Sequence, residues 1–517
     1  MIVSARHGRG VATAPWAAAS AGIAAAFVGA GTGELAGALL APASRPFAVV
    51  GGALIDAAPA WAKDTAIAWF GTSDKAALLV GIGIVLVIVA AVAGSCQARW
   101  PRSGVIAFAA IGAIVGILAL TRPEAGTLSW LPSVLAGAVA AIAVRLLVRN
   151  APPRDVGEGV GAPSRRQFLI WAGGTAAVGA AMAFAGSIAR AGATAVASVR
   201  DAIRLPRAAQ PAPALPVGAA LDVPGLAPLV TPNDEFYRID TALIVPTVDP
   251  ADWKLRVHGM VAQEVTLTWD ELRALPLTET AVTLSCVSNP VGGDLVGNAV
   301  WLGYPLRDLL AKAQPLADAD MVLSTSIDGF TAGTPIEALT DARDALLAIG
   351  MNGEPLPLAH GFPVRMVVPG LYGYVSATKW VTDLEVTRFD KARAYWTDRG
   401  WSERGPIKLQ SRIDVPRAGR DVQAGDSVIA GVAWQPQTGI SGVEVQVDDG
   451  PWQGAELAPA ISSDTWVQWR MPWRAKPGDH RIRCRAIGGD GSTQTDQYAS
   501  PAPNGASGWH TIPVTVG

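Results

Sequence analysis

Hydrophobic and polar residues are distributed very unevenly along the 517 positions of this chain. Up to about residue 190, alanine, valine, isoleucine, leucine and glycine form long runs with few charges. After that point, aspartate, arginine, tryptophan and proline reach the frequencies of an ordinary globular protein. Since about 20 consecutive apolar residues suffice for a helix to cross a membrane, the pattern predicts an N-terminal membrane region followed by a soluble region.

Five stretches of the membrane region are apolar enough to be transmembrane helices, although Gly104–Leu120 is short for a span. They are Trp16–Leu40, Ala76–Ala98, Gly104–Leu120, Leu128–Val148 and Phe168–Ile188. Between the first two, an apolar segment with charged residues and a proline between Asp56 and Asp64 indicates an interfacial or re-entrant excursion, with a sixth span as the alternative. Basic residues are concentrated on alternate sides of the five spans. This bias predicts a multi-pass protein of a bacterial cell membrane, with everything after residue 190 on the extracytoplasmic side.

A short basic motif precedes the fifth apolar stretch. The letters SRRQFLI at 164–170 resemble a twin-arginine export signal, except that Ile170 stands where lysine is usual. The alternative is an ordinary positive flank of a transmembrane helix, where paired arginines are common. Twin-arginine export carries folded proteins, so the motif predicts a domain that receives a cofactor before export and stays anchored by this helix.

The soluble region shows two different patterns of short strands. Its first part mixes alternating strands with two helical segments, WDELRAL and LGYPLRDLLAKA, which is typical of an α+β domain. Its second part contains alternating strands at close spacing, with turn signals such as Asp449-Gly450, and predicts an all-β sandwich of the immunoglobulin type. The predicted boundaries are 1–190 for an all-α transmembrane region, 191–228 for a Pro/Ala linker, 229–405 for the α+β domain and 406–517 for the sandwich.

Charge and cysteine usage narrow the possible functions. The net charge of −2, from 41 Lys+Arg against 43 Asp+Glu, indicates no nucleic-acid partner. The three cysteines lie in separate regions, which excludes a disulfide framework. Cys96 lies in a span and Cys484 in an alternating strand, so both are predicted to be packing residues. Cys286 ends a strand and precedes the glycine-rich SNPVGGDLVGN loop, so a core position and a soft metal ligand are both open.

Several separated motifs resemble, in order, those of the sulfite oxidase superfamily of molybdopterin oxidoreductases, over more than half of the chain. They are PNDEFYRID (232–240), TLSCVSN (283–289), WLGYPLRDLL (301–310), HGFPVRMVVPGLYGYVSATKW (360–380) and the strands after Gly405. The resemblance implies a sulfite-oxidase-type fold for the α+β domain and a molybdenum-molybdopterin cofactor. It also implies that the Cys286 thiolate ligates the metal, and that the C-terminal sandwich supports a homodimer.

The resemblance also implies further site residues. The implied cofactor contacts are Asn233, Phe236, Tyr237, Arg238, Asn289, Thr325, His360, Arg365, Ser376 and Lys379. The last four lie in one short segment and supply the cations and donors that a pterin phosphate needs, although a strand with charges at its ends is the alternative. Phe236 also suits a plain core position. Tyr395, in AYWTDRGW, is a candidate catalytic proton donor, with surface packing as its alternative.

One departure from the family bears on the substrate. Sulfite-oxidising members carry arginines after the cysteine, whereas here Cys286 is followed by VSNPVGG, with Asn289 but no arginine. We therefore expect an enzyme that transfers an oxygen atom at molybdenum, acting on an S-oxide or related small molecule. Sulfite oxidation is one alternative, and a non-catalytic membrane-anchored binding protein with a degenerate site is another.

The sequence offers no internal route for electrons. There is no CxxCH motif, no cysteine cluster, and none of the five histidines lies in an apolar span. We expect a separate electron-transfer partner, either a haem protein or the quinone pool. Transport by the helices is disfavoured, because the spans show no buried ionisable residues of the kind that transport needs.

Overall fold

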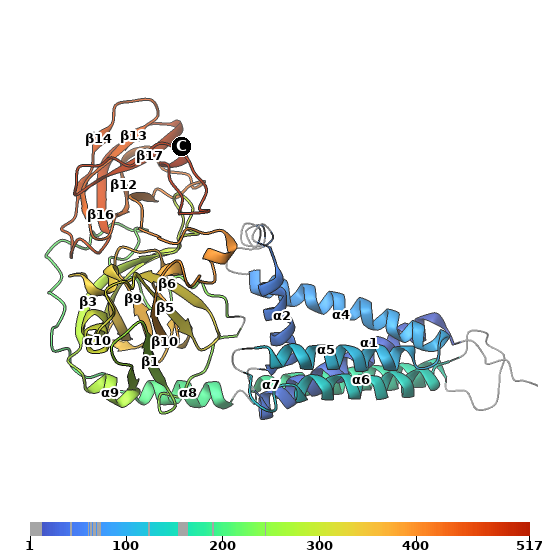
Figure 1. Cartoon of the computed structure of the whole chain (residues 1–517). Helices are drawn as coiled ribbons and strands as arrows, with labels where there is room; N and C mark the ends of the chain where they lie inside the picture. The colour runs from blue at the N-terminus through green and yellow to red at the C-terminus, as the bar shows by residue number, and fades with distance from the viewer. Residues whose placement is uncertain are drawn as a thin grey trace, which may run out of the picture. The chain divides into compact units, whose positions relative to one another are not determined.

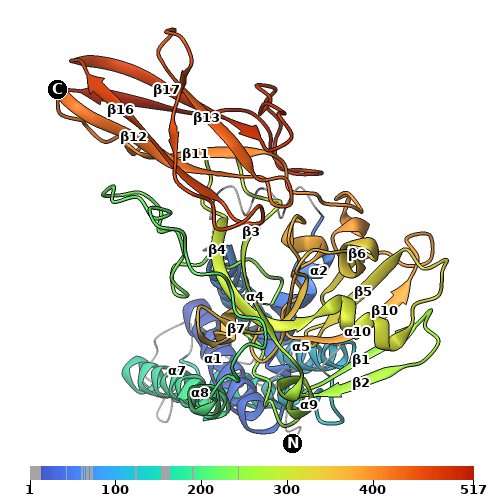
Figure 2. The same cartoon turned by 90° about the vertical axis from the view of Figure 1, so that its left-hand side faces the viewer.

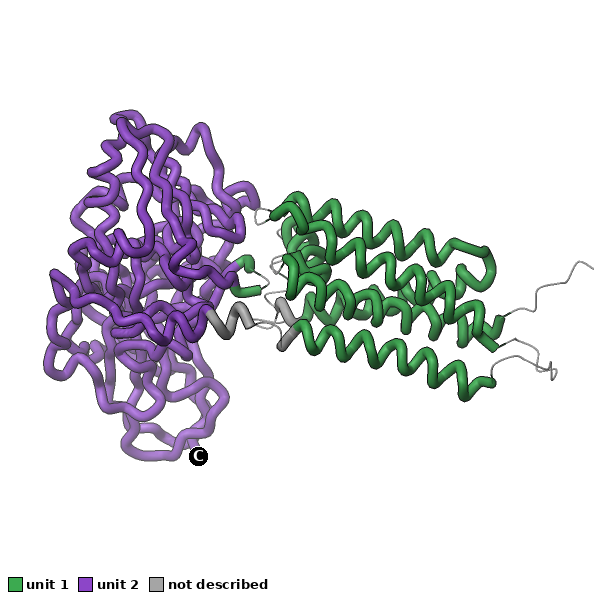
Figure 3. The backbone as a smooth tube through the Cα atoms, turned by 90° about the horizontal axis from the view of Figure 1, so that it is seen from below, with its two compact units in different colours: residues 1–195, 241–245 green, residues 196–240, 246–517 purple. Residues whose placement is uncertain are grey.

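A computed structural model describes most of the chain. It leaves out residues 1–12, 42–43, 60–61, 63–64, 66–68, 70–73, 123–124, 153–163, 189–190 and 243. The chain divides into two compact units, Met1–Ala195 with Thr241–Val245, and Val196–Asp240 with Pro246–Gly517 (Figure 3). The first unit is helical and the second is built mainly from β-sheets (Figure 1).

The first unit consists of long apolar helices. Its elements are α1 (Pro15–Leu40), α2 (Pro46–Ala57), α4 (Asp74–Arg99), α5 (Ser103–Leu120), α6 (Leu131–Arg149) and α7 (Arg165–Ile188). The next helix, α8 (Ala191–Ala202), begins in the first unit and ends in the second. Among the described residues, five helices are long and apolar enough to cross a membrane, judged by length and composition, and α2 is a shorter apolar helix. The prediction of five spans with an interruption after the first is therefore confirmed at that level.

Glycines bring the helices of this unit into close contact. A Cβ atom added at Gly22 of α1 would collide with the backbone of Ala90 in α4, and one at Gly31 would collide with Gly179 in α7. Small residues allow such close backbone approach, which is how apolar helices gain packing energy where no water drives them together. The glycine-rich composition of this region is therefore a packing feature of the bundle.

The expectation that the spans contain no buried ionisable residue is wrong. Glu34 lies within α1 and is mostly buried, with its carboxylate 3.9 Å from the Arg45 guanidinium. The same carboxylate accepts a hydrogen bond of 3.1 Å from Phe47 N, in the first turn of α2. The first N–H groups of a helix lack partners within the helix, so Glu34 serves as an acceptor for the start of α2.

The predicted linker is partly helical. α8 (Ala191–Ala202) occupies its first residues, because this stretch is rich in alanine and free of proline. Among the described residues, no helix or strand lies between α8 and Lys254. The Pro/Ala-rich part of the predicted linker follows α8 and has no regular secondary structure, as its composition indicates.

Two sheets and three short helices follow, which confirms the predicted α+β mixture. The strands are β1 (Lys254–Gly259), β2 (Val265–Thr268), β3 (Thr278–Ser285), β4 (Val296–Pro305), β5 (Met321–Ser326), β6 (Thr331–Pro335), β7 (Leu346–Met351), β8 (Glu354–Pro355), β9 (Arg365–Val367) and β10 (Val381–Thr387). The helices are α9 (Trp269–Ala274), α10 (Leu306–Ala313) and α11 (Glu337–Thr340), and the short 3-10 turns are η3 (Leu358–His360), η4 (Gly373–Val375) and η5 (Thr397–Arg399). One sheet has the order β2-β1-β10-β5-β6, and the other has β3-β4-β7-β8 with β9 added to β7. Thr268 and Glu271 form the capping box that starts α9.

The remaining strands form a two-layer antiparallel sandwich, which we call the C-terminal sandwich (Figure 2). Its strands are β11 (Gln410–Val415), β12 (Gly425–Trp434), β13 (Ile440–Val447), β14 (Gln453–Gly454), β15 (Glu456–Leu457), β16 (Val467–Ala475), β17 (Gly478–Gly488) and β18 (His510–Val516). The sheets have the orders β11-β12-β16-β15 and β14-β13-β17-β18. Trp469 of one sheet shares a core with Val445 and Cys484 of the other. The predicted sandwich and the packing role of Cys484 are thus confirmed, and the immunoglobulin type stays a prediction.

Candidate active site

Cys286 lies where β3 ends and a tight loop to β4 begins. Its backbone N–H donates to Leu295 O at 2.9 Å, and its carbonyl accepts from Asn289 N at 3.1 Å. The Asn289 side chain closes the same loop by accepting from Leu295 N at 2.9 Å. The predicted cofactor contact Asn289 is therefore, in the first place, the residue that shapes the loop carrying the thiol.

The surroundings of the Cys286 thiol are polar although the side chain is only 8% exposed. Burial raises the pKa of this thiol, while hydrogen bonds from Ser288 and the charge of Lys379 lower it. Burial, and then the neighbouring Cys286 charge, raise the pKa of Tyr237 and bring that of Tyr372 to about 12. Two protonated phenols thus lie close to a thiol that a bound metal would convert to a thiolate.

Arg365, on β9, is a buried cation without an anionic partner. It is 5% exposed, and its Nη1 donates to His360 O at 3.1 Å. Its guanidinium lies 4.9 Å from the centre of the Trp301 ring, and burial lowers its pKa to about 10. In the described part of the chain, no carboxylate lies within ion-pair distance of it. A buried charge is costly unless it is paired, so this position calls for an external anion.

Lys379 and Arg238 share one carboxylate. Lys379 Nζ donates to Asp240 Oδ2 at 2.5 Å, and Arg238 Nε donates to the same oxygen at 2.8 Å. Burial lowers the pKa of Lys379 to about 8 even though Asp240 favours its charged form. With Arg365, whose charge acts on Lys379, the region therefore contains three cationic side chains and one carboxylate among the described residues.

His360 completes this group as a neutral side chain. It is buried, and its Nε2 lies 3.2 Å from Asn233 O, which can only accept a hydrogen bond. Burial, and then the charges of Arg365 and Lys379, lower its pKa to about 4. His360 therefore acts near neutral pH as a hydrogen-bonding group without adding charge.

These residues fit molybdenum-molybdopterin at two places: the cationic side chains suit its phosphate, and the Cys286 thiol suits its metal. Three cations against one carboxylate leave two positive charges uncompensated, which matches a phosphate group with two negative charges. Among the described residues, no group of three or more His, Cys, Asp or Glu side chains is placed to hold a metal. Cys286 can therefore ligate a metal only if a cofactor supplies the other ligands.

Other predicted contacts support this cluster from outside. Asn233 Oδ1 accepts from Asn352 Nδ2 at 2.8 Å, so its side chain fixes the neighbouring turn. Phe236 is buried and packs edge-on against Trp301 and His360, as its core alternative suggested. Ser376 is fully buried and its Oγ donates to Tyr372 O at 3.0 Å.

Thr325 and Tyr395 have no described contact with this cluster. Ser324 Oγ lies 2.7 Å from Thr378 Oγ1, which belongs to residues 360–380, here called the clamp segment. Alternate residues of a strand face opposite sides, so Thr325 points away from the clamp segment. Tyr395 packs against Phe330 and Trp396, with ring centres 5.8 and 5.2 Å away. Their proposed roles stay predictions that no contact among the described residues supports.

Sequence reasoning missed Asp240, Ser288 and Tyr372. Asp240 follows Arg238 by two positions in YRID, and the excess of cations in the clamp was a signal that a carboxylate would be needed. Ser288 stands in the quoted TLSCVSN motif, two residues after the cysteine. Tyr372 is one of two tyrosines in GLYGY, and nothing in the sequence indicates which of them faces Cys286.

Comparisons with known proteins identify the family of this chain. Residues 242–396 match the family described as oxidoreductase molybdopterin binding domain. The sulfite oxidase of Gallus gallus is 30% identical over 319 residues, covering 52% of this chain and 69% of that protein. The mitochondrial sulfite oxidase of Mus musculus is 31% identical over 342 residues, covering 56% of this chain and 62% of its own length, less than two thirds. The solved sulfane dehydrogenase SoxCD from Paracoccus pantotrophus aligns with a TM-score of 0.48 and 22% identity, over 55% of this chain and 81% of that one.

Fold, site and sequence matches define a molybdopterin-dependent oxidoreductase whose cofactor is molybdenum-molybdopterin. The chain belongs to the sulfite oxidase family. The resemblance of its motifs to that family is thereby confirmed.

Proposed function

We propose that this protein is a membrane-anchored, extracytoplasmic enzyme that reduces a neutral S-oxide or related small molecule. The observation that carries the proposal is the charge of the loop from Val287 to Leu295, which contains no cation and one anion, Asp294. The arginine that reaches this loop, Arg412, is paired with Asp414. An anionic substrate would therefore meet no uncompensated positive charge from this loop.

The residues around Cys286 would have different roles in this reaction. Bound molybdenum-molybdopterin supplies oxygen-atom transfer. The Cys286 thiolate would hold the metal, and Arg365 and Lys379 would hold the phosphate. Tyr372 keeps its phenolic proton, because burial raises its pKa to about 12, and the charge of Cys286 acts on it in the same direction. That proton can form a hydrogen bond to the oxygen of a neutral substrate.

The reaction needs an electron donor. Reducing one S-oxide to a sulfide and water consumes two electrons and two protons. We propose that a separate haem protein or the quinone pool delivers the electrons, in keeping with a chain that has no CxxCH motif and no cysteine cluster. A purified preparation can use a reduced viologen instead, two equivalents for each turnover.

The substrate proposal predicts a ratio of activities. The protein should reduce dimethyl sulfoxide with a kcat/KM at least ~10-fold above that for sulfite oxidation, because a hydrogen bond to a charged group contributes about 1.5–3 kcal/mol and the loop from Val287 to Leu295 contains no cation that could make one with sulfite. Steady-state assays with reduced viologen and with ferricyanide measure the two reactions.

Sulfite oxidation is the second candidate, because the named relatives are sulfite oxidases. Faster sulfite oxidation than sulfoxide reduction by the unmodified protein would reject our substrate proposal. A molybdenum content near zero in purified protein would favour the third possibility, a non-catalytic binding protein.

If the second unit is exported through the twin-arginine motif, loss of that motif should cause an export defect. Replacing Arg165 and Arg166 together by lysine should leave the helices from α1 to α6 inserted but keep the second unit inside the cell. The substitutions conserve charge, so they should not affect topology if the arginines are only an ordinary positive flank. Twin-arginine export, in contrast, requires the arginines themselves. Protease accessibility in spheroplasts measures the outcome. An accessible second unit in the double variant would reject the twin-arginine proposal.

A further inference from the structure

The C-terminal sandwich contacts the loop that follows Cys286. Arg412 Nη1 donates to Gly293 O at 3.0 Å. The preceding Gly292 has a φ of 75° and lies directly against the His510 ring, so that a Cβ atom there would collide with the imidazole. A side chain at this glycine is therefore excluded both by its backbone conformation and by the sandwich.

Arg412 and His510 are themselves held in place. Arg412 Nε donates to Asp414 Oδ1 at 2.6 Å, with the two side chains 11% and 10% exposed. Asp414 also accepts from Ala227 N at 3.2 Å. His510 Nδ1 accepts from Ile413 N at 2.9 Å, which fixes the ring. The two side chains therefore present a rigid surface to the loop.

A second contact holds the strand on the other side of the cysteine. β3 is an edge strand of its sheet. Thr283, three residues before Cys286, donates its N–H to Asp464 O at 2.9 Å, and its Oγ1 accepts from Trp466 N at 2.8 Å. The sandwich thus covers the free edge of β3 and fixes the chain on both sides of the thiol.

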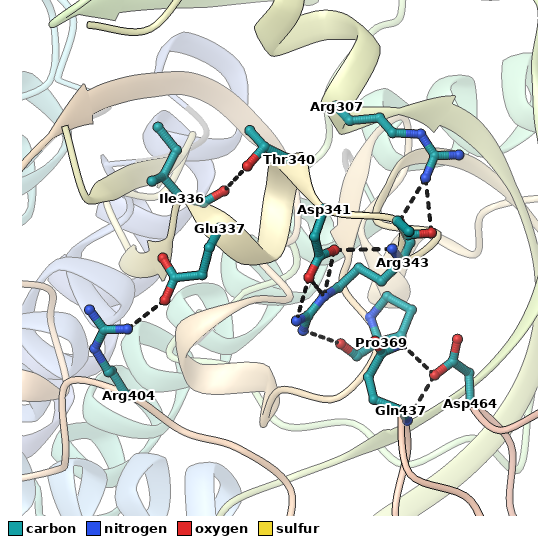
Figure 4. A network of polar contacts seen from close by, with 11 residues as sticks. Arg307, Ile336, Glu337, Thr340, Asp341, Arg343, Pro369, Arg404, Gln437 and Asp464 are labelled. Atoms are coloured by element: carbon teal, nitrogen blue, oxygen red, sulfur yellow. Dashed lines mark hydrogen bonds and ion pairs between the residues drawn. The ribbon is translucent and has the colours of Figure 1, made fainter. Parts of the chain in front are cut away.

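A related network holds the clamp segment (Figure 4). Arg343 Nη1 donates to Pro369 O at 3.0 Å, next to Gly370. The Gln437 side chain packs on Gly370 and its Nε2 donates to Asp464 at 2.6 Å. The loop of Asp464 therefore contacts the cysteine strand directly and the segment that leads to Tyr372 through Gln437.

The loop after Cys286 also borders open space. Gly292, Asp294 and Val296 line a cavity of about 700 Å³ together with Arg412 and His510. A loop beside a cavity of this size has room to relax. The contacts with Arg412 and His510 are what oppose such movement on this side.

We propose that Arg412 and His510 are positioning residues, which hold the Gly292–Gly293 segment and through it the Cys286 thiol in the geometry that turnover needs. The C-terminal sandwich would then help to position the Cys286 thiol, in addition to any role in a dimer. The proposal rests on the proposed function insofar as Cys286 is the metal ligand. The Arg412 charge is neutralised by Asp414 and its free donor is directed at a backbone carbonyl, so it acts through the loop and not on the substrate.

The test uses a paired substitution in the full-length protein. Arg412→Met with Asp414→Asn removes the bond to Gly293 O without leaving a buried charge unpaired, and asparagine can still accept from Ala227 N. The matched control is Arg470→Met with Glu456→Gln, an ion pair of 3.0 Å in the same sandwich that is exposed to solvent. The probes are dimethyl sulfoxide with reduced viologen for the holoenzyme and iodoacetamide for the cofactor-free protein.

The Arg412 pair variant should lower kcat by roughly ten- to a hundredfold, the loss expected when a reacting group is misplaced by about 1 Å. Its molybdenum content and unfolding temperature should match those of the control pair. In cofactor-free protein, alkylation of Cys286, followed by peptide mass spectrometry, should be several-fold faster than in the control.

Wild-type kcat together with control-level alkylation would overturn the proposal. If the pair variant unfolds at a lower temperature than the control, His510→Asn decides instead. This change keeps an acceptor for Ile413 N but removes the ring from Gly292, and unchanged Cys286 alkylation would then reject the proposal. If the wild type reduces no S-oxide, the proposed function fails, but the alkylation comparison still tests the positioning role.

Discussion

Replacing Cys286 with alanine is expected to abolish turnover while the pterin stays bound. The phosphate cluster of Arg365, Lys379 and His360 belongs to other segments of the chain, so loss of the thiol leaves it intact. The metal would lose its one protein sulfur ligand, and a metal's reactivity depends on the identity of its ligands. Activity assays, with fluorescence of the released pterin as the measure of cofactor content, test both parts.

The matched control is Cys484→Ala. Cys484 is fully buried, and its Sγ lies 3.3 Å from Ser411 Oγ in the core of the sandwich. The substitution removes a small packing group from the core of the sandwich, so it can lower the unfolding temperature. Because Cys484 holds neither the metal nor the phosphate, kcat should stay within about twofold of the wild type. An active Cys286→Ala protein would reject the assignment of Cys286 as the metal ligand.

The contrast between these two cysteines shows where sequence reasoning stops. Both occur in alternating strands, and alternation alone predicts a buried side chain for each. Cys484 is surrounded by core residues, whereas Cys286 has Ser288, Lys379 and two tyrosines as neighbours. The glycine-rich loop after Cys286 left a metal ligand open for that thiol alone, and the motifs of the family then favoured this role. The sequence pattern could not show the polar neighbours themselves, because they include residues from distant parts of the chain.

The membrane helices, the α+β domain and the C-terminal sandwich were predictable because their helices and strands depend on local sequence patterns. Apolar runs of sufficient length predict spans, and strict alternation predicts strands with one buried face. The burial of Glu34 was missed because its partner, Phe47 N, lies 13 residues away in the sequence. Asp240 was missed for the same physical reason, since Lys379 reaches it from 139 positions further along the chain.

Thr325 illustrates what resemblance to a family motif leaves open. A motif places a residue on a strand, but the register of that strand decides which way the side chain points. Ser324, its neighbour, faces the clamp segment through Thr378. The predicted cofactor contact of Thr325 therefore stays a prediction, because the motif alone does not fix the face of the sheet to which its side chain points.

Replacing Arg365 with methionine should separate cofactor binding from stability. Arg365 is buried without a carboxylate partner among the described residues, and burying an unpaired charge opposes folding. Methionine fills similar space without charge, so the unfolding temperature of the cofactor-free protein should not fall, although the His360 carbonyl loses a donor. Cofactor affinity, in contrast, should fall about tenfold to a hundredfold, since hydrogen bonds to charged groups contribute about 1.5–3 kcal/mol each.

The comparison for this prediction is Arg238→Met. Arg238 is partly exposed and shares Asp240 with Lys379, so its removal leaves Asp240 paired and should reduce cofactor content less than the loss of Arg365. Pterin and molybdenum content after purification, with thermal unfolding of cofactor-free samples, measure the two effects. If Arg365→Met lowered stability strongly and kept a full complement of cofactor, Arg365 would be a structural residue of the fold. The phosphate would then have to be held by other groups.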